Sequence, residues 1–217
     1  MNSTSLNLSL ESIEKSILEF CQNGNLYSIK KILTNPQFKD YIDISFNIEN
    51  LILEAIKYGH LDIIEYLFSN IEDYNTHNIE KNQFIIKSCE YGQLKCLKYF
   101  LSILFIDDKY FKSCEEGFIY ACHNNHISIV DYFTKNHIIP YDIHNIMSEG
   151  LILACKWDNI SIVKYYIFDL CFNINHSTLQ SINYLNLSVE IKTLIFVRTL
   201  MIDLALTTNE NKEFSKI

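Results

Sequence analysis

The sequence predicts an all-α protein built from stacked repeats, and three observations lead to that prediction. Only five Gly and two Pro occur in 217 residues, and a hairpin-rich sheet would need more of these turn-forming residues. Apolar residues recur at helical spacing, and one short pattern recurs five times with a period near 33 residues. The hydrophobic content of 48% is ample for a buried core. We therefore expect an array of helical units.

Each copy of the repeat begins with a residue that tolerates a left-handed backbone. These anchor residues are Gly24, Gly59, Gly92, Asn125 and Asp158, and their starts differ by 35, 33, 33 and 33 residues. Gly, Asn and Asp adopt the left-handed conformation more readily than other residues, and this conformation commonly ends a helix. A helix is therefore expected to stop at each anchor.

Two helices are expected in each repeat, one before and one after the anchor. The segments 51–58 and 151–157 are examples of the first helix, and Leu61, Ile64 and Leu67 mark the apolar face of a second. Mostly small side chains occur four and three residues before the anchors, at Phe20-Cys21, Ala55-Ile56, Ser88-Cys89, Ala121-Cys122 and Ala154-Cys155. These predict close packing between helices. One pair cannot bury its own apolar faces, so each repeat must support the next.

With these features the chain resembles an ankyrin-repeat protein over about residues 14–175, and Gly59-His60-Leu61-Asp62-Ile63-Ile64-Glu65-Tyr66-Leu67 is the closest match. The resemblance implies an ankyrin-type solenoid of stacked helix-turn-helix units with a terminal capping helix. The Thr-Pro-Leu-His tetrapeptide of that family is replaced, for example by Asn50-Leu-Ile-Leu53. Because connectors such as 71–82 also lack a turn Gly, irregular loops are expected there instead of β-hairpins.

The Ile-, Asn- and Tyr-rich composition further resembles the ankyrin-repeat proteins of giant DNA viruses, although an AT-rich protist genome would give a similar composition. This second resemblance implies a role in engaging host proteins.

The repeats set the expected domain organisation. Residues 1–13 form a leader or partial cap, and residues 14–188 form the ankyrin-like array. The repeat boundaries are 14–47, 48–80, 81–113, 114–146 and 147–180. Residues 189–217 form a capping helix and tail, with apolar residues on more than one face at Leu194, Phe196, Val197, Leu200, Met201 and Leu204. We expect a cap packed on two sides; an interface is the alternative.

Charge and cysteine usage exclude several classes of protein. A net charge of −8 without a Lys or Arg cluster argues against nucleic-acid binding. The apolar run 194–206 is interrupted by Arg198 and Asp203 and is too short to cross a membrane. Seven Cys without a CxxC pair or a secretory h-region indicate reduced thiols. A cytoplasmic or nuclear protein is expected, in the host cell if the protein is viral.

The cysteines are interpreted mainly as core residues. Cys21, Cys89, Cys122 and Cys155 share one repeat position and are expected to fill the gap between helices. Cys114 and Cys171 fall in expected connectors, and for these two an exposed, reactive thiol is the alternative to the favoured structural role.

Motifs for chemistry are missing from the sequence. Cys122-His123 with His126 resembles part of a zinc site, but no second pair completes four ligands. The sequence contains no phosphate-binding, dinucleotide-binding or hydrolase motif. The acidic pairs Asp107-Asp108 and Glu115-Glu116 are expected in connectors, without acid–base geometry. No catalytic residue, metal or cofactor is therefore predicted.

The connectors instead suggest a binding surface. In ankyrin-like arrays the connectors and first helices line a concave face, and Tyr beside acidic groups suits a basic protein partner. The candidate partner-binding residues are Asp73, Tyr74, His77, Asp107, Asp108, Tyr110, Tyr141, Asp142 and His144. The sequence fits equally well an alternative in which these acidic residues of the connectors only increase solubility.

The sequence thus predicts a monomeric protein-protein interaction module. The alternative is a structural or self-associating solenoid that uses residues 194–204 and has no dedicated partner site. A third reading, an enzyme with an unfamiliar site, would require a deep pocket with convergent titratable groups.

Overall fold

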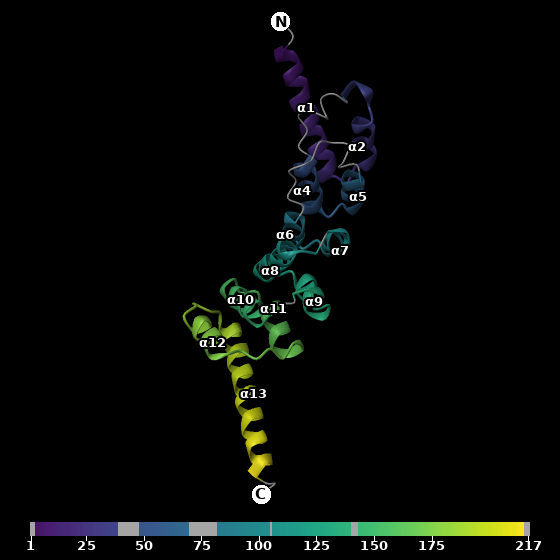
Figure 1. Cartoon of the computed structure of the whole chain (residues 1–217). Coiled ribbons are helices and arrows are strands. Elements are labelled where there is room, and N and C mark those ends of the chain that lie inside the picture. The colour runs from purple at the N-terminus through teal and green to yellow at the C-terminus, as the bar shows by residue number, and fades with distance from the viewer. Residues whose placement is uncertain (1–2, 39–47, 70–81, 105, 140–142, 215–217) are drawn as a thin grey trace. The chain divides into compact units, whose positions relative to one another are not determined.

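The computed structural model describes residues 3–38, 48–69, 82–104, 106–139 and 143–214. Within these residues every regular element is helical and no strand occurs, which confirms the all-α prediction. The chain divides into two compact units, unit 1 (Met1–Ser113) and unit 2 (Cys114–Ile217). The division falls inside one continuous helix, α8 (Asp108–His123) (Figure 1).

Unit 1 consists of successive helix pairs. They are α1 (Ser3–Gln22) with α2 (Leu26–Leu33), α4 (Ile48–Tyr58) with α5 (Leu61–Ser69), and α6 (Gln83–Glu90) with α7 (Leu94–Ile103), and a short 3-10 turn, η1 (Pro36–Phe38), follows α2. The first helices pack in the order α1, α4, α6, and α5 packs on α7 (Figure 1). Residues 3–13, expected as a leader or partial cap, are helical and form the first part of α1.

Unit 2 begins with the second part of α8 and continues less regularly. It contains α9 (Ile127–Lys135), α10 (Ile143–Lys156), α11 (Ile160–Lys164), the π-helical segment η3 (Tyr165–Asp169), α12 (His176–Asn183) and α13 (Val189–Phe214). Helix α10 packs on α11 and α12, and α11 packs on α9 and α13. Helix α12 was not predicted from the sequence; its start is capped by the Asn175 side chain, which accepts the Thr178 backbone N–H at 2.8 Å.

All five anchors adopt the predicted left-handed backbone. Their φ values are +70° at Gly24, +78° at Gly59, +73° at Gly92, +62° at Asn125 and +57° at Asp158. After each anchor, the next N–H returns to the carbonyl five residues earlier, as from His60 to Ala55 at 2.9 Å. This is the bond of a Schellman motif, which closes the C-terminal end of a helix.

A ladder of hydrogen bonds links consecutive repeats at these turns, and we call it the turn ladder. His60 Nε2 lies 2.9 Å from the carbonyl oxygen of Gln22, and Gln93 Nε2 donates to the carbonyl of Lys57 at 3.1 Å. In unit 2, Asn159 Nδ2 donates to the carbonyls of Cys122 and His123, at 2.9 and 2.7 Å. The last carbonyls of a helix lack intrahelical partners, so three different side chain types satisfy the same need.

Contacts between second helices also recur. Lys30 Nζ lies 4.9 Å from the ring centroid of Tyr66, and the Tyr165 hydroxyl donates to Asp131 Oδ1 at 2.8 Å. Lys30 and Asp131 occupy one repeat position, and Tyr66 and Tyr165 occupy the next. The repeated tyrosine is therefore used for stacking of neighbouring repeats.

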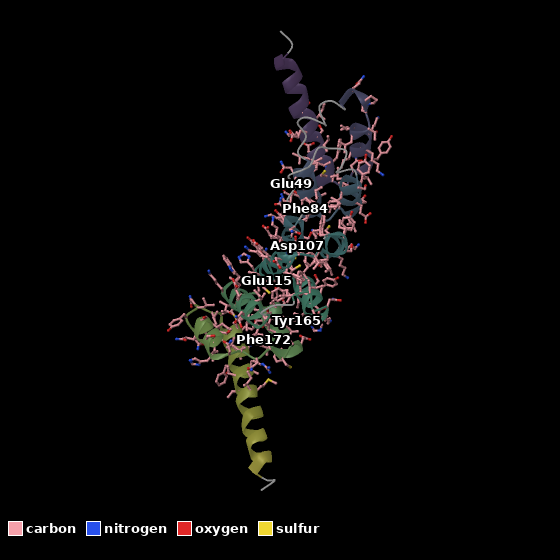
Figure 2. All side chains as sticks on the ribbon, in the orientation of Figure 1. Glu49, Phe84, Asp107, Glu115, Tyr165 and Phe172 are labelled. Atoms are coloured by element: carbon pink, nitrogen blue, oxygen red, sulfur yellow. The ribbon has the colours of Figure 1, made fainter. Side chains whose placement is uncertain are left out.

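The cores of both units are closely packed. In unit 1, Phe84 and Phe100 have ring centroids 5.1 Å apart, and Phe68 lies against both. In unit 2, a Cβ on Gly150 would lie 2.7 Å from the Tyr166 hydroxyl and 2.8 Å from Cys122 Sγ, so α10 approaches α8 very closely. Figure 2 labels Phe84 in unit 1 and Phe172 in unit 2 among the side chains. The shared register of Cys21, Cys89, Cys122 and Cys155 is buried, as predicted.

Two expectations about connectors were wrong. Helix α8 starts at Asp108 because Asp107 Oδ1 accepts the Tyr110 backbone N–H at 2.7 Å and caps the helix. Cys114 therefore lies inside α8 and is buried, and Glu115-Glu116 is helical as well. Cys171, the other cysteine that was placed in a connector, is exposed.

The terminal helix α13 packs differently from the two-sided cap that was predicted. Ile191, Leu194 and Ile195 are buried on one face, whereas Phe196 is 62% exposed. Leu200 and Met201 are also exposed. One apolar face of α13 is thus packed and another faces solvent.

Candidate functional site

The structure describes four of the nine predicted partner-binding residues. Asp73, Tyr74, His77, Tyr141 and Asp142 lie outside the described residues. Asp107 and Asp108 are exposed at the start of α8, where Asp107 acts as the helix cap (Figure 2). His144 is exposed on α10, and its Nε2 lies 3.2 Å from the Asn173 carbonyl oxygen. Asp107, Asp108 and Tyr110 belong to unit 1, and His144 belongs to unit 2.

Tyr110 is placed in the core. Its side chain is only 6% exposed, and its ring centroid lies 5.5 Å from that of Phe111. Tyr110 follows the cap by three residues, and this position turns its ring inward. It therefore belongs to the packing of α8 and not to an accessible surface.

In unit 1 the exposed face of the first helices is covered by polar pairs. Gln22 Nε2 donates to Glu54 Oε1 at 3.0 Å, and Lys57 Nζ lies 3.6 Å from the same oxygen. Lys87 and Glu90 pair at 2.7 Å. The Gln83 side chain donates to Glu49, which Figure 2 labels. These polar groups already have partners within the unit.

In unit 2 the corresponding positions carry larger apolar groups. Tyr120 and Leu153 occupy the position of Glu54 and Lys87, and Trp157 occupies that of Tyr58. Trp157, the only Trp in the chain, is 54% exposed, and Tyr120 is 37% exposed. The His123 ring packs edge-on to the Trp157 ring, with 4.8 Å between centroids. An aromatic surface therefore spans α8 and α10.

This aromatic surface was not predicted from the sequence. The signal for it was a single Trp immediately before the Asp158 anchor, at a position where the other copies carry Asn or Tyr. Trp and Tyr are the residue types most enriched at binding hot spots. The repeat is defined by residues that the five copies share, whereas this surface is formed by residues that differ between the copies.

The buried thiols are chemically inert. Burial raises the pKa of Cys21, Cys122 and Cys155 to about 12 and that of Cys96 to about 11. The thiolate is the nucleophile and the metal ligand, so these groups stay protonated at neutral pH and are poor candidates for either role.

The partial zinc pattern is not assembled into a ligand set. Cys122 Sγ lies 3.7 Å from the Tyr166 hydroxyl, and His123 Nδ1 lies 2.8 Å from Asn124 Oδ1. Among the side chains that the structure describes, no three His, Cys, Asp or Glu residues are grouped so that they could hold a metal ion.

An open depression of about 330 Å³ lies along α12. It is lined by His176, Leu179, Gln180, Asn183 and Tyr184. All of these come from one helix and the residue that follows it. The depression therefore lacks the opposing walls that would bring an acid and a base to a bound substrate from two sides.

Comparisons with protein-family models, curated proteins and solved structures find no match to this chain. None of the helices in the described residues is long and apolar enough to cross a bilayer.

Proposed function

We propose that the chain is a protein-protein interaction module built from ankyrin-like repeats. The left-handed anchors, the Schellman turns and the turn ladder support the repeat interpretation, because each recurs at the same position of successive copies. The observation that carries the binding function is the exposure of large aromatic side chains, above all Trp157, on the first helices. Such side chains supply much of the affinity in protein interfaces.

The resemblance to the ankyrin-repeat proteins of giant viruses extends this proposal. A viral chain would meet its partner in the cytoplasm or nucleus of the host cell. The acidic groups at the start of α8, Asp107 and Asp108, favour a basic partner because they remain exposed. The module would act as a monomer and without catalysis.

Affinity capture from source-cell lysate tests the binding function. The immobilised chain should retain one protein close to stoichiometrically, and cross-linking with mass spectrometry should place that protein on the first helices. Charge reversal at Asp108, which leaves the Asp107 cap of α8 in place, should weaken retention. If nothing is retained above the level of an unrelated acidic protein, the proposed function is wrong.

Self-association is a second candidate function, and the open face of α13 favours it. Phe196, Leu200 and Leu204 follow one another at four-residue spacing and are 62%, 43% and 64% exposed, on a helix whose opposite face is buried. Exposed apolar surface of this kind commonly marks an interface. Sedimentation velocity over a roughly hundredfold range of concentration decides between the candidates. A constant monomer supports the first, and a dimer abolished by Phe196→Asp supports the second.

A further inference from the structure

Helices α8 and α10 share a pattern of side chains: on each, a Glu is followed along the helix by apolar or aromatic residues at four-residue spacing. On α8, Glu116 and Tyr120 are four residues apart. Glu149 and Leu153 of α10 and Trp157, directly after its end, also follow at intervals of four, and the Trp157 N–H still donates to the Leu153 carbonyl at 3.0 Å. Residues four apart lie on one face of a helix. Each helix therefore presents a stripe that starts with a carboxylate and continues into apolar or aromatic surface. We call Glu116, Tyr120, His123, Glu149 and Trp157 the Trp157 surface.

The two stripes lie on neighbouring helices. Gly150 allows α10 to approach α8 closely, and the Asn159 side chain ties the end of α8 to the turn after α10. The contact between the His123 and Trp157 rings joins the aromatic ends. All of these residues belong to unit 2, so the surface is complete within that unit.

The carboxylates of this surface are available for a partner. Glu116 and Glu149 are exposed, and neither takes part in an ion pair among the described residues. In unit 1 the same repeat position carries Lys15, Asn50 and Gln83. Two cations lie close in sequence: Lys112 precedes Glu116 by one helical turn, and Lys156 Nζ lies over the Trp157 ring at 5.9 Å from the centroid.

We propose that the Trp157 surface binds a protein segment that carries a Lys or Arg a few residues away from an aromatic or apolar anchor. This inference rests on the proposed binding function and assigns its site and the chemistry of its partner. The basic side chain would pair with Glu116 or Glu149, and the anchor would pack on Trp157 and Tyr120. Charge complementarity selects this occupant over a second copy of the chain, whose net charge is −8.

The geometry also sets the spacing within the partner. Glu149 and Trp157 are separated by eight residues of helix, which is about 12 Å at 1.5 Å per residue. An extended peptide covers that distance in about four residues. The basic residue and the anchor should therefore lie three to four positions apart in an extended partner segment, by the same estimate of about 3.3 Å per residue.

The test uses the full chain and a displayed library of random peptides of about twelve residues. Selected peptides should combine a Lys or Arg with an aromatic or apolar residue at the predicted spacing. Their binding should change the fluorescence of Trp157, which is the only Trp. Trp157→Ala and the pair Glu116→Lys with Glu149→Lys should each weaken binding about tenfold or more.

Tyr58→Ala is the matched control, because Tyr58 occupies the same repeat position in unit 1 and is similarly exposed at 47%. It should leave the affinity unchanged, and Trp157→Phe should retain most of it. Circular dichroism and urea unfolding should show that each variant is folded. The inference is overturned if no peptide is enriched, if enriched peptides lack basic residues, or if Trp157→Ala and Tyr58→Ala bind equally.

The failure of this inference can be told apart from that of the proposed function. If a lysate protein is retained equally by the chain and by Trp157→Ala, the assignment of the site is wrong but the binding function is still supported. If no protein is retained and no peptide is enriched from the library, both the binding function and the proposed site are wrong.

Discussion

At the scale of single residues, the anchors show how one backbone conformation selects a residue type. Gly24 and Gly59 combine a positive φ with close approach: a Cβ on Gly24 would lie 2.7 Å from His60 Cε1, and one on Gly59 would lie 2.4 Å from Gln93 Oε1. The residue after one anchor thus occupies the space that the previous anchor leaves free. Asp158 has the same backbone at φ +57° but carries a Cβ.

Replacing Asp158 by Gly should therefore stabilise the chain. A left-handed residue with a Cβ costs about 1–2 kcal/mol, part of which Asp recovers by local hydrogen bonding, so we expect a gain of about 0.5–1 kcal/mol. Gly59→Ala should lose at least about 1–2 kcal/mol because it adds the Gln93 clash to the backbone cost. Urea unfolding measures both changes, and a loss of stability in Asp158→Gly would contradict the explanation.

The cysteines give a second prediction at the residue scale. Six thiols are buried and Cys171 is exposed. An aromatic disulfide reagent should titrate one thiol in the native chain and all seven after unfolding, because access and thiolate character control the reaction. Cys171→Ser should remove the fast phase, and Cys114→Ser should leave it unchanged. A fast reaction of two or more thiols would show that the helices around the buried thiols are loosely packed.

At the scale of elements, Arg198 joins α13 to the end of the fifth repeat. It is the only Arg in the chain and is 9% exposed. Its Nε donates to the Phe172 carbonyl at 3.0 Å, and a terminal nitrogen donates to the carbonyl of Cys171. These carbonyls follow the π-helical segment η3, where the regular helical bonds have ended. The planar guanidinium can serve two acceptors at once, which a Lys ammonium does less well.

Arg198→Ala should destabilise unit 2 by about 2–3 kcal/mol, the usual range for charge-assisted hydrogen bonds whose acceptors become unsatisfied. Arg198→Lys should recover only part of that loss. Hydrogen exchange should show lost protection in α13 around Ile191–Ile195. Lys192→Ala, on the exposed side of the same helix, is the control and should change little. Equal effects of the two alanine variants would mean that Arg198 does not hold α13 to the fifth repeat.

The elements differ in how far the sequence could predict them. The anchors and paired helices were predictable because local backbone preference and apolar spacing agree there. The start of α8 was missed because Asp107, whose side chain caps the helix, was placed in a connector together with Glu115 and Glu116. Helix α12 was missed because it repeats no earlier pattern. The π-helical segment η3 was missed because its sequence follows the second-helix pattern of the other copies, which are α-helical there. Trp157 was missed as a site residue because its exposure depends on how α10 packs against α8.

At the scale of the whole molecule, the buried ionisable groups are distributed over both units. Cys21 and Cys96 lie in unit 1, and Cys122 and Cys155 lie in unit 2. Burial raises the pKa of each, from a usual 9.0 to about 11 at Cys96 and about 12 at the others. Tyr166 beside Cys122 has a raised pKa for the same reason. High pH should therefore weaken the fold along its whole length and not at one site.

The sign of this effect of pH on the free energy of unfolding follows from proton binding. Above about pH 9 the unfolded chain loses its thiol protons while the native chain keeps them, so the free energy of unfolding falls as pH rises, until the native thiols titrate near pH 11 to 12. At about pH 10 one such thiol costs about 1.4 kcal/mol. Urea midpoints at about pH 7.5 and about pH 10 measure the loss. Cys122→Ala should reduce the pH dependence by about that amount, whereas Cys171→Ser should not change it. Equal midpoints at the two pH values would mean that water reaches these thiols. The first helices would then not be tightly stacked.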